Sequence, residues 1–208
     1  MYHFARRRMA DKKALGPGGP LWEKTMKLPI TALLLSAAFL PFAGDAQAAS
    51  LTSGKKLEVH VDEAKVEEEK KALWAQFGGW CAIAEWHPAI KTCEDSKEGD
   101  VEYRTLTLQD GGKIKEKLLE KSGASYRYEI IESPLPVKNY EAQFTVTPDD
   151  DDLDEVNIVW AATYDAADGK EDADARKTID GIFKDGIESI KGKLGDKVVD
   201  KKKKKDND

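Results

Sequence analysis

The feature that most constrains the fold is a long amphipathic segment near the end of the chain, residues 172–194. Apolar side chains recur along it at three- and four-residue spacing and Asp and Lys residues lie opposite them, which predicts one long α-helix. The apolar stripe consists of Ala175, Ile179, Ile182, Phe183, Ile187, Ile190 and Leu194. A stripe of this length must pack against a broad apolar surface, and the surface that the rest of the sequence offers is the face of a β-sheet.

Residues 90–164 supply that sheet as successive segments in which apolar and polar side chains alternate between turn residues. A further alternating segment, residues 56–61, precedes them. Between the two, Asp62 is a good N-cap for a helix, and Gly78-Gly79 weakens that helix and predicts a break. We expect a second short helix over residues 81–85, so the whole pattern predicts an α+β domain.

One hairpin, within residues 101–121, can be placed in register from its own pattern. A loop at residues 110–112 pairs Leu106 with Glu116 and keeps the apolar face intact. In this register Arg104 lies on the same largely apolar face as Glu116. Because a buried charge without a partner costs several kcal/mol, we expect these two side chains to pair or to share a polar ligand.

Residues 26–48 have the organisation of a secretory signal peptide. A charged start is followed by an apolar run over residues 30–42 and by Ala46-Gln47-Ala48, after which we expect cleavage. The apolar run is shorter than the roughly 20 residues of a bilayer span, so no stable membrane span is expected. Residues 1–25 carry no apolar periodicity and are expected to be an over-long start, with a twin-arginine signal at Arg6-Arg7 as the alternative.

The charge of the chain argues against nucleic acid as a partner. The 26 basic and 36 acidic side chains that follow residue 48 leave a net charge near −10, whereas phosphate binding needs clustered Lys and Arg. The basic cluster Lys201–Lys205 lies in a polar tail, residues 195–208, which we expect to be disordered. This tail either stays solvated or touches an anionic surface or an acidic partner.

Two cysteines, Cys81 and Cys93, fall in the part of the chain that we expect to be exported. An oxidising compartment such as the periplasm permits a disulfide, which here would close a loop of about a dozen residues and contribute roughly 3 kcal/mol. Two free buried thiols are the alternative. A metal site is not expected, because the sequence has neither a Cys-x-x-Cys motif nor a flanking His pair.

Several motifs accompany this order of elements: Phe77-Gly78-Gly79, Trp86-His87-Pro88, Arg104, Asp110-Gly111-Gly112, Glu116, Tyr126-x-Tyr128, Pro134-Leu135-Pro136-x-x-Asn139-Tyr140 and Trp160. With them the chain resembles the SRPBCC (START-like) superfamily of the polyketide cyclase/dehydrase type, including exported members associated with methanol oxidation in methylotrophic bacteria. The resemblance implies a helix-grip fold over residues 49–194. In that fold a curved antiparallel sheet of about seven strands wraps around the long C-terminal helix, a short helix pair follows strand 1, and a cavity remains inside. A charged helix face at 67–71, an acidic turn at 149–152 and the lysine tail depart from the family pattern, so the subfamily stays open.

The predicted ligand-binding residues are the aromatic and polar side chains expected to face inward or to line the mouth: Trp86, His87, Arg104, Glu116, Tyr126, Tyr128, Tyr140 and Trp160. A few placed polar groups in an aromatic pocket suit a small molecule. His87, Arg104 and Glu116 are also the candidates for proton transfer. The alternatives are structural. His87 packs in the core or caps the helix end, and Arg104 and Glu116 form a buried ion pair that fixes the sheet. The tyrosines and Trp160 are then ordinary aromatic core.

No nucleophile paired with a base, metal-ligand cluster or glycine-rich phosphate loop stands out in the sequence, so no cofactor is expected. The preferred hypothesis is a non-enzymatic periplasmic or secreted protein of a Gram-negative bacterium. It would hold a hydrophobic or aromatic small molecule and act as an accessory to a periplasmic oxidoreductase system such as methanol oxidation. One alternative is a cyclase, dehydratase or lyase; the other is a docking factor with a vestigial cavity.

Overall fold

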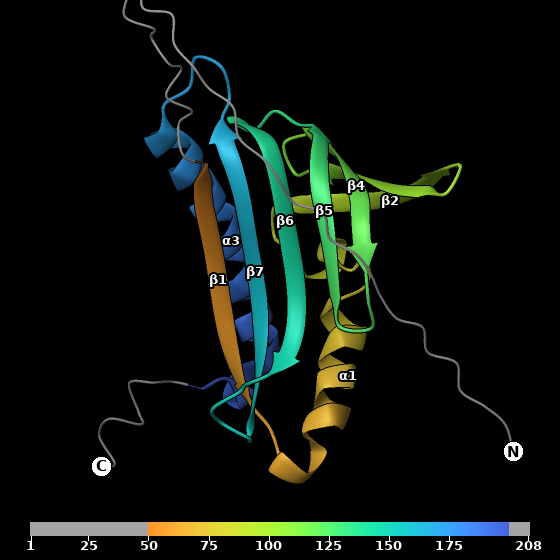
Figure 1. Ribbon diagram of the computed structural model, residues 1–208, viewed down its shortest axis with the longest axis vertical. Coiled ribbons are helices and arrows are strands. Elements are labelled where there is room, and N and C mark those ends of the chain that lie inside the picture. The colour runs from red at the N-terminus through yellow and green to blue at the C-terminus, as the bar shows by residue number, and fades with distance from the viewer. Residues whose placement is uncertain (1–49, 200–208) are drawn as a thin grey trace, which may run out of the picture. The chain divides into compact units, whose positions relative to one another are not determined.

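The computed structural model describes residues 50–199 of the 208-residue chain (Figure 1). The predicted signal peptide, the segment before it and the lysine cluster of the tail lie outside the described residues. The strands are β1 (Leu51–His60), β2 (Ile90–Glu98), β3 (Val101–Leu108), β4 (Lys113–Lys121), β5 (Ser125–Glu132), β6 (Val137–Pro148) and β7 (Glu155–Ala166). The helices are η1 (Glu63–Lys65), α1 (Val66–Phe77), α2 (Ile83–Trp86), α3 (Asp172–Leu194) and η2 (Gly195–Lys197).

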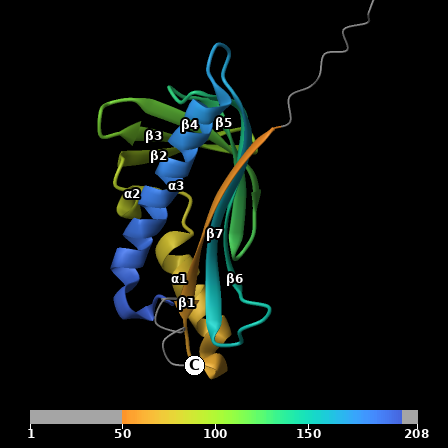
Figure 2. The same cartoon turned by 90° about the vertical axis from the view of Figure 1, so that its left-hand side faces the viewer.

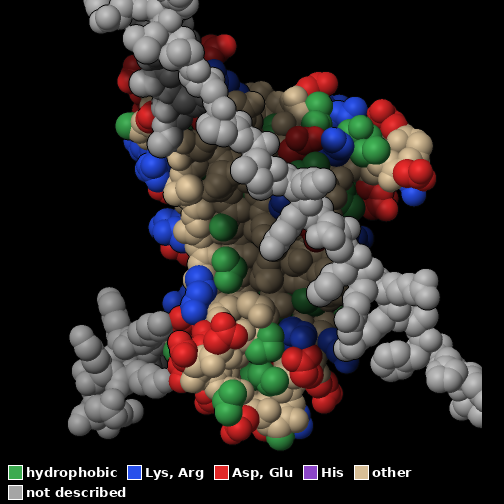
Figure 3. Space-filling view, viewed as in Figure 1, with side chains coloured by type: hydrophobic (Ala, Val, Ile, Leu, Met, Phe, Trp, Pro, Cys, Tyr) green, Lys and Arg blue, Asp and Glu red, His purple; other side chains and the backbone are tan. Residues whose placement is uncertain are grey.

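The seven strands form one antiparallel sheet in the order β1-β7-β6-β5-β4-β3-β2. All three α-helices lie on one side of this sheet, and the curved sheet wraps around α3 (Figure 2). On the visible part of the opposite face, few hydrophobic side chains show and charged ones lie along the margins (Figure 3). The core therefore lies between the sheet and the helices, and the predicted helix-grip architecture is confirmed.

The long helix α3 begins and ends where the sequence pattern predicts, and five of the seven residues of the predicted stripe are buried, while Ile182 and Leu194 are half-buried. Gly186 lies at the centre of that stripe. A Cβ atom at Gly186 would lie 2.8 Å from Cδ2 of His87, 2.9 Å from Cζ3 of Trp160 and 3.0 Å from Cζ3 of Trp86. Because these distances are too short for a side chain, glycine is what lets α3 approach the aromatic rings of the core.

The hairpin of β3 and β4 corrects the predicted register by two residues. Arg104 pairs directly with Glu116, and Leu106 with Ile114. The loop begins one residue earlier than expected, and Gly111 takes its left-handed position with φ of 89°. Three-residue hairpin loops place a glycine there. Since a shift of two residues leaves every side chain on its face, the predicted apolar face survives the error.

The first strand is longer than predicted, because β1 begins at Leu51 and pairs with β7 along its whole length. Its first half contains Thr52, Ser53 and Gly54 and so lacks the alternating apolar pattern that identifies a strand. Pairing with β7 forms it nonetheless, assisted by a buried hydrogen bond of 2.6 Å between the Ser53 and Tyr164 hydroxyls. Tertiary contacts thus extend a strand that the local sequence does not indicate.

The helical segment after β1 begins as predicted, with the Asp62 carboxylate accepting a hydrogen bond of 3.0 Å from the Ala64 amide. The break at Gly78-Gly79 is confirmed. The second helix, α2, begins at Ile83 rather than Cys81 and ends where His87 turns extended before Pro88. The predicted disulfide between Cys81 and Cys93 is also present, with their Cα atoms 5.5 Å apart, and it ties the turn before α2 to β2.

Residues 195–199, which the sequence assigned to the tail, continue the domain. They form η2 and a bridge in which Val198 pairs with Val59 of β1. The Val199 amide donates a hydrogen bond of 3.0 Å to the Glu58 carbonyl. Over residues 50–199, no helix is long and apolar enough to cross a membrane.

Candidate functional site

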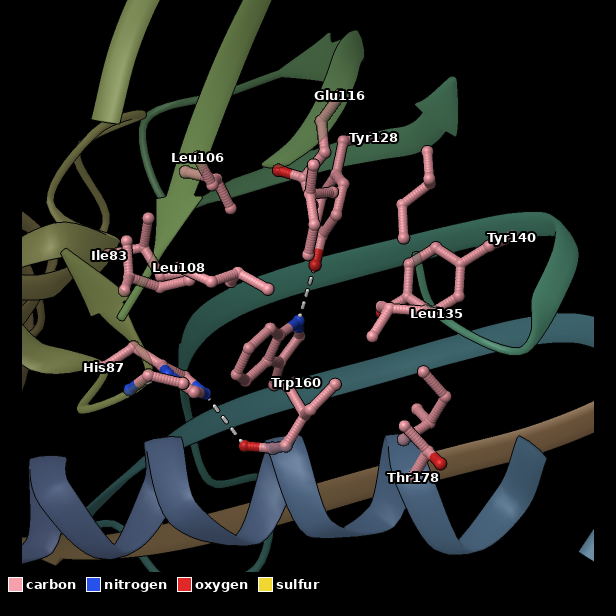
Figure 4. A pocket seen from close by; sticks show the side chains of 16 residues that line it. Ile83, His87, Leu106, Leu108, Glu116, Tyr128, Leu135, Tyr140, Trp160 and Thr178 are labelled. Carbon is pink, nitrogen blue, oxygen red and sulfur yellow. Dashed lines mark hydrogen bonds between the residues drawn. The ribbon is translucent and has the colours of Figure 1, made fainter. Parts of the chain in front are cut away.

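A cavity of about 240 Å³ lies between the inner face of the sheet, the end of α2 and the N-terminal half of α3 (Figure 4). Sixteen residues line it, and ten of them are Ile, Leu or Ala. The strands contribute wall residues from β2 to β7 because their inward positions alternate with outward ones. The sheet and α3 thus build the hollow that the element order implied.

The structure brings five of the eight predicted ligand-binding residues to the cavity wall: His87, Glu116, Tyr128, Tyr140 and Trp160. The other three, Trp86, Arg104 and Tyr126, are buried behind the wall. Trp86 and Tyr126 each stack on Phe144, in both cases with ring centroids 5.7 Å apart. Trp74 of α1 lies against Tyr126 with ring centroids 6.0 Å apart, and Trp80 lies against the Arg104 guanidinium. Alternation along the strands does not reveal where these residues cover the sheet's inner face.

Arg104 and Glu116 form a buried ion pair across β3 and β4. The Arg104 Nε donates to Glu116 Oε2 at 2.5 Å, and Nη1 donates to the carbonyl of Trp80. The guanidinium also lies over the Trp80 ring, with Cζ 3.9 Å from the ring centroid, and 5.0 Å from that of Tyr128. Arg104 is 0% exposed and Glu116 is 4% exposed, so the carboxylate separates the guanidinium from the cavity.

Burial and the partner's charge act in opposite directions on the pKa of each member of the pair. Burial by itself lowers the pKa of Arg104, but Glu116, Tyr126 and Tyr128 together outweigh burial and raise that pKa. Burial raises the pKa of Glu116, and the Arg104 guanidinium opposes this rise. Because a guanidinium does not lose its proton in proteins, neutralising Glu116 would leave a buried cation without its counterion.

His87 is held in one neutral tautomer. Its Nε2 donates a hydrogen bond of 3.0 Å to the Ile182 carbonyl of α3, and its Nδ1 accepts one of 3.2 Å from the Ala89 amide. Burial lowers the pKa of His87. Since both ring nitrogens have backbone partners, the histidine presents carbon atoms to the cavity and anchors α2 to α3.

An aromatic group forms another side of the cavity (Figure 4). Trp160 donates a hydrogen bond of 2.9 Å from Nε1 to the Tyr128 hydroxyl and stacks on Phe183 of α3, with ring centroids 4.3 Å apart. Tyr140 lies beside Tyr128 at 6.2 Å between centroids. Burial raises the pKa of both tyrosines, so their hydroxyls stay protonated and neutral.

Sequence reasoning missed the aliphatic part of the wall, including Ile83, Leu108, Leu135, Thr178 and Ile182. Ile182 belongs to the predicted stripe of α3, but the pattern assigns that stripe to packing and does not separate packed positions from cavity positions. Leu135 lies in the Pro134-Leu135-Pro136 segment between β5 and β6, where no strand pattern indicates which side chain faces inward.

The acidic turn between β6 and β7 is organised by its own hydrogen bonds. The Asp149 carboxylate accepts from Asn157 Nδ2 at 2.7 Å, from the Asp151 amide at 2.9 Å and from Lys56 Nζ at 3.2 Å. These bonds, with that of Asn157 first, lower the pKa of Asp149. Within residues 50–199, His, Cys, Asp and Glu side chains form no group of three or more that could hold a metal ion.

Comparison with known proteins places this geometry in a family. The family model described as polyketide cyclase / dehydrase and lipid transport matches residues 58–195. Protein XoxI from Bacillus cereus has a similar structure, with a TM-score of 0.59 at 22% identity over 70% of this chain and 96% of that one. No curated protein matches the chain at a significant level.

Two more distant structures share the fold. A START superfamily protein from Mycobacterium smegmatis has a TM-score of 0.51 at 13% identity, over 69% of this chain and 96% of that one. The Zhui aromatase/cyclase from Streptomyces sp. R1128 has a TM-score of 0.50 at 11% identity, over 70% of this chain and 91% of that one. At such identities the likeness concerns the fold alone.

Proposed function

Because the chain belongs to the polyketide cyclase/dehydrase and lipid transport family, we propose that it binds a small apolar or aromatic molecule in the cavity beside α3. The observation that carries this proposal is the composition of the wall, where ten aliphatic residues surround a few polar groups. Ligand sites are built in this way, since apolar walls provide affinity and a few polar groups fix orientation.

The arrangement favours binding over catalysis. His87 has both ring nitrogens bonded to backbone groups, so neither is free to exchange a proton with a ligand. Arg104 lies behind Glu116 and does not reach the cavity. Glu116 is therefore the one of the three candidates for proton transfer that lines the cavity with an oxygen atom available to a ligand.

Glu116 supports the second candidate function, an enzyme of cyclase, dehydratase or lyase type. Burial in an apolar wall raises the pKa of Glu116, which is how carboxylates are adapted to general acid or base work. Under this alternative, purified protein turns over a cavity ligand and Glu116→Gln abolishes turnover while circular dichroism still shows a folded domain. Under the binding function, the bound molecule is recovered chemically unchanged.

The binding function is tested by native mass spectrometry and by titration with propylbenzene, an apolar probe. Ile182→Trp fills the cavity from α3 and should remove propylbenzene binding. Lys184→Trp, on the exposed side of the same helix, is the matched control and should bind normally. Equal binding by wild type and Ile182→Trp would place the ligand elsewhere and refute the proposal.

We also propose that the chain is exported and serves as an accessory factor of a periplasmic oxidation system such as methanol oxidation. The signal-like pattern of residues 26–48 supports export, and the Cys81–Cys93 disulfide suits an oxidising compartment. Cell fractionation and the mass of the mature protein test this: we expect a periplasmic protein that begins at Ala49. A cytoplasmic protein that retains residues 26–48 would contradict it.

A further inference from the structure

Glu116 is the one side chain with a formal charge among the sixteen that line the cavity. It projects from β4 on the sheet side, across the cavity from the helix that carries Thr178 (Figure 4). One of its oxygens, Oε2, is taken by Arg104. For the other, Oε1, the described part of the chain provides no hydrogen-bond partner within reach. The cavity therefore offers a carboxylate oxygen as a hydrogen-bond acceptor in a mainly apolar wall.

The charge arrangement behind Glu116 decides which ligands this acceptor suits. The Arg104 guanidinium donates from Nε to Glu116 and from Nη1 to the Trp80 carbonyl, while its buried Nη2 has no partner among residues 50–199. Because Arg104 does not line the cavity and Glu116 does, an anionic ligand meets the carboxylate first. A cationic ligand gains little, because Arg104 already neutralises Glu116. An uncharged donor, a hydroxyl or an N–H group, satisfies the free oxygen without introducing another buried charge.

The size of the cavity limits the rest of the molecule. A dry apolar cavity of about 150 Å³ holds benzene, which has six non-hydrogen atoms. Scaling by volume, the cavity of about 240 Å³ holds on the order of ten such atoms. That is a single ring with a short alkyl chain, and a molecule of several fused rings is too large.

Resting on the binding function above, we propose that the ligand is an uncharged, mainly apolar molecule of about ten non-hydrogen atoms with one hydroxyl or N–H group that donates to the free oxygen of Glu116. The ion pair with Arg104 then acts as the support that holds this acceptor in place. The cavity accordingly selects phenol-like or alcohol-like molecules and rejects carboxylic acids of equal size.

Isothermal titration of the full chain with three probes of similar size tests this selection at pH 7. We expect 4-propylphenol to bind roughly 10- to 100-fold more tightly than propylbenzene, as hydrogen bonds to charged groups allow. No binding of 4-ethylbenzoate is expected. Equal affinities for the phenol and propylbenzene refute the inference and leave the binding function intact, and tight binding of the benzoate also refutes it. Failure of all three probes to bind overturns both.

A double variant isolates the role of the carboxylate. Arg104→Met with Glu116→Leu replaces the buried ion pair by apolar side chains of similar size, a change that buried pairs often tolerate. It should still bind propylbenzene but lose the preference for 4-propylphenol. A preference that persists in this folded variant refutes the assignment to Glu116. If the variant does not fold, the three wild-type titrations decide the matter alone.

Discussion

The close approach of α3 to the aromatic core rests on Gly186, and Gly186→Ala tests it. An added Cβ lies 2.8 to 3.0 Å from ring carbons of His87, Trp160 and Trp86, so either the helix or the rings must move. Overpacking of this kind costs about 1–3 kcal/mol. Alanine also favours a helix over glycine by about 1 kcal/mol, so the net loss of unfolding free energy should be about 0–2 kcal/mol.

Gly181 and Gly192 provide matched controls in the same helix, because a Cβ at either position meets no atom within 4 Å. Alanine at these two positions should raise the free energy of unfolding by about 0.5–1 kcal/mol. Urea unfolding followed by tryptophan fluorescence measures all three variants. The difference between Gly186→Ala and the controls isolates the packing cost, about 1–3 kcal/mol. If Gly186→Ala stabilises the protein as much as the controls do, α3 does not lie against these rings.

Three further predictions concern the core. Arg104→Met leaves Glu116 as a buried charge without a partner and should lower the unfolding free energy, measured by urea titration, by about 3–5 kcal/mol. A surface ion pair contributes about 0–1 kcal/mol, so a loss under about 1 kcal/mol would contradict a buried pair. Because burial lowers the pKa of His87, the neutral ring stabilises the fold above the unfolded pKa of about 6.5, and this stability is lost as pH falls through the folded-state pKa. His87→Gln should therefore flatten the pH dependence of unfolding below about pH 6.5, and an unchanged profile argues against this origin. Reduction of the disulfide between Cys81 and Cys93 should cost roughly 3 kcal/mol, and thermal melts with and without reductant measure it.

The parts of the fold that the sequence predicts are the helix and strands whose apolar residues recur at regular spacing. The bounds of α3 follow from one uninterrupted stripe, and the faces of β3 and β4 follow from their alternation. The register of that hairpin was wrong by two residues because alternation is unchanged by an even shift, and the loop geometry at Gly111 decides it. The first half of β1 has no such pattern and forms through its pairing with β7.

The site was predictable where chemistry constrains it. The contact between Arg104 and Glu116 followed from the cost of burying either charge alone, and the structure shows it. Which inward side chains reach the cavity was not predictable, since that depends on where α1 covers the sheet. Tyr126 and Tyr128 share one face of β5, yet only Tyr128 lines the cavity.

The proposal that the cavity beside α3 binds an apolar molecule is tested most directly by methyl NMR during a titration with propylbenzene. The methyl resonances of Ile83, Ile179 and Ile182 on the cavity wall should shift together and saturate. Those of Ile131, which is 44% exposed, should stay in place. Shifts at Ile131 with none at the three wall residues would show that the molecule binds the surface and that the cavity is not its site.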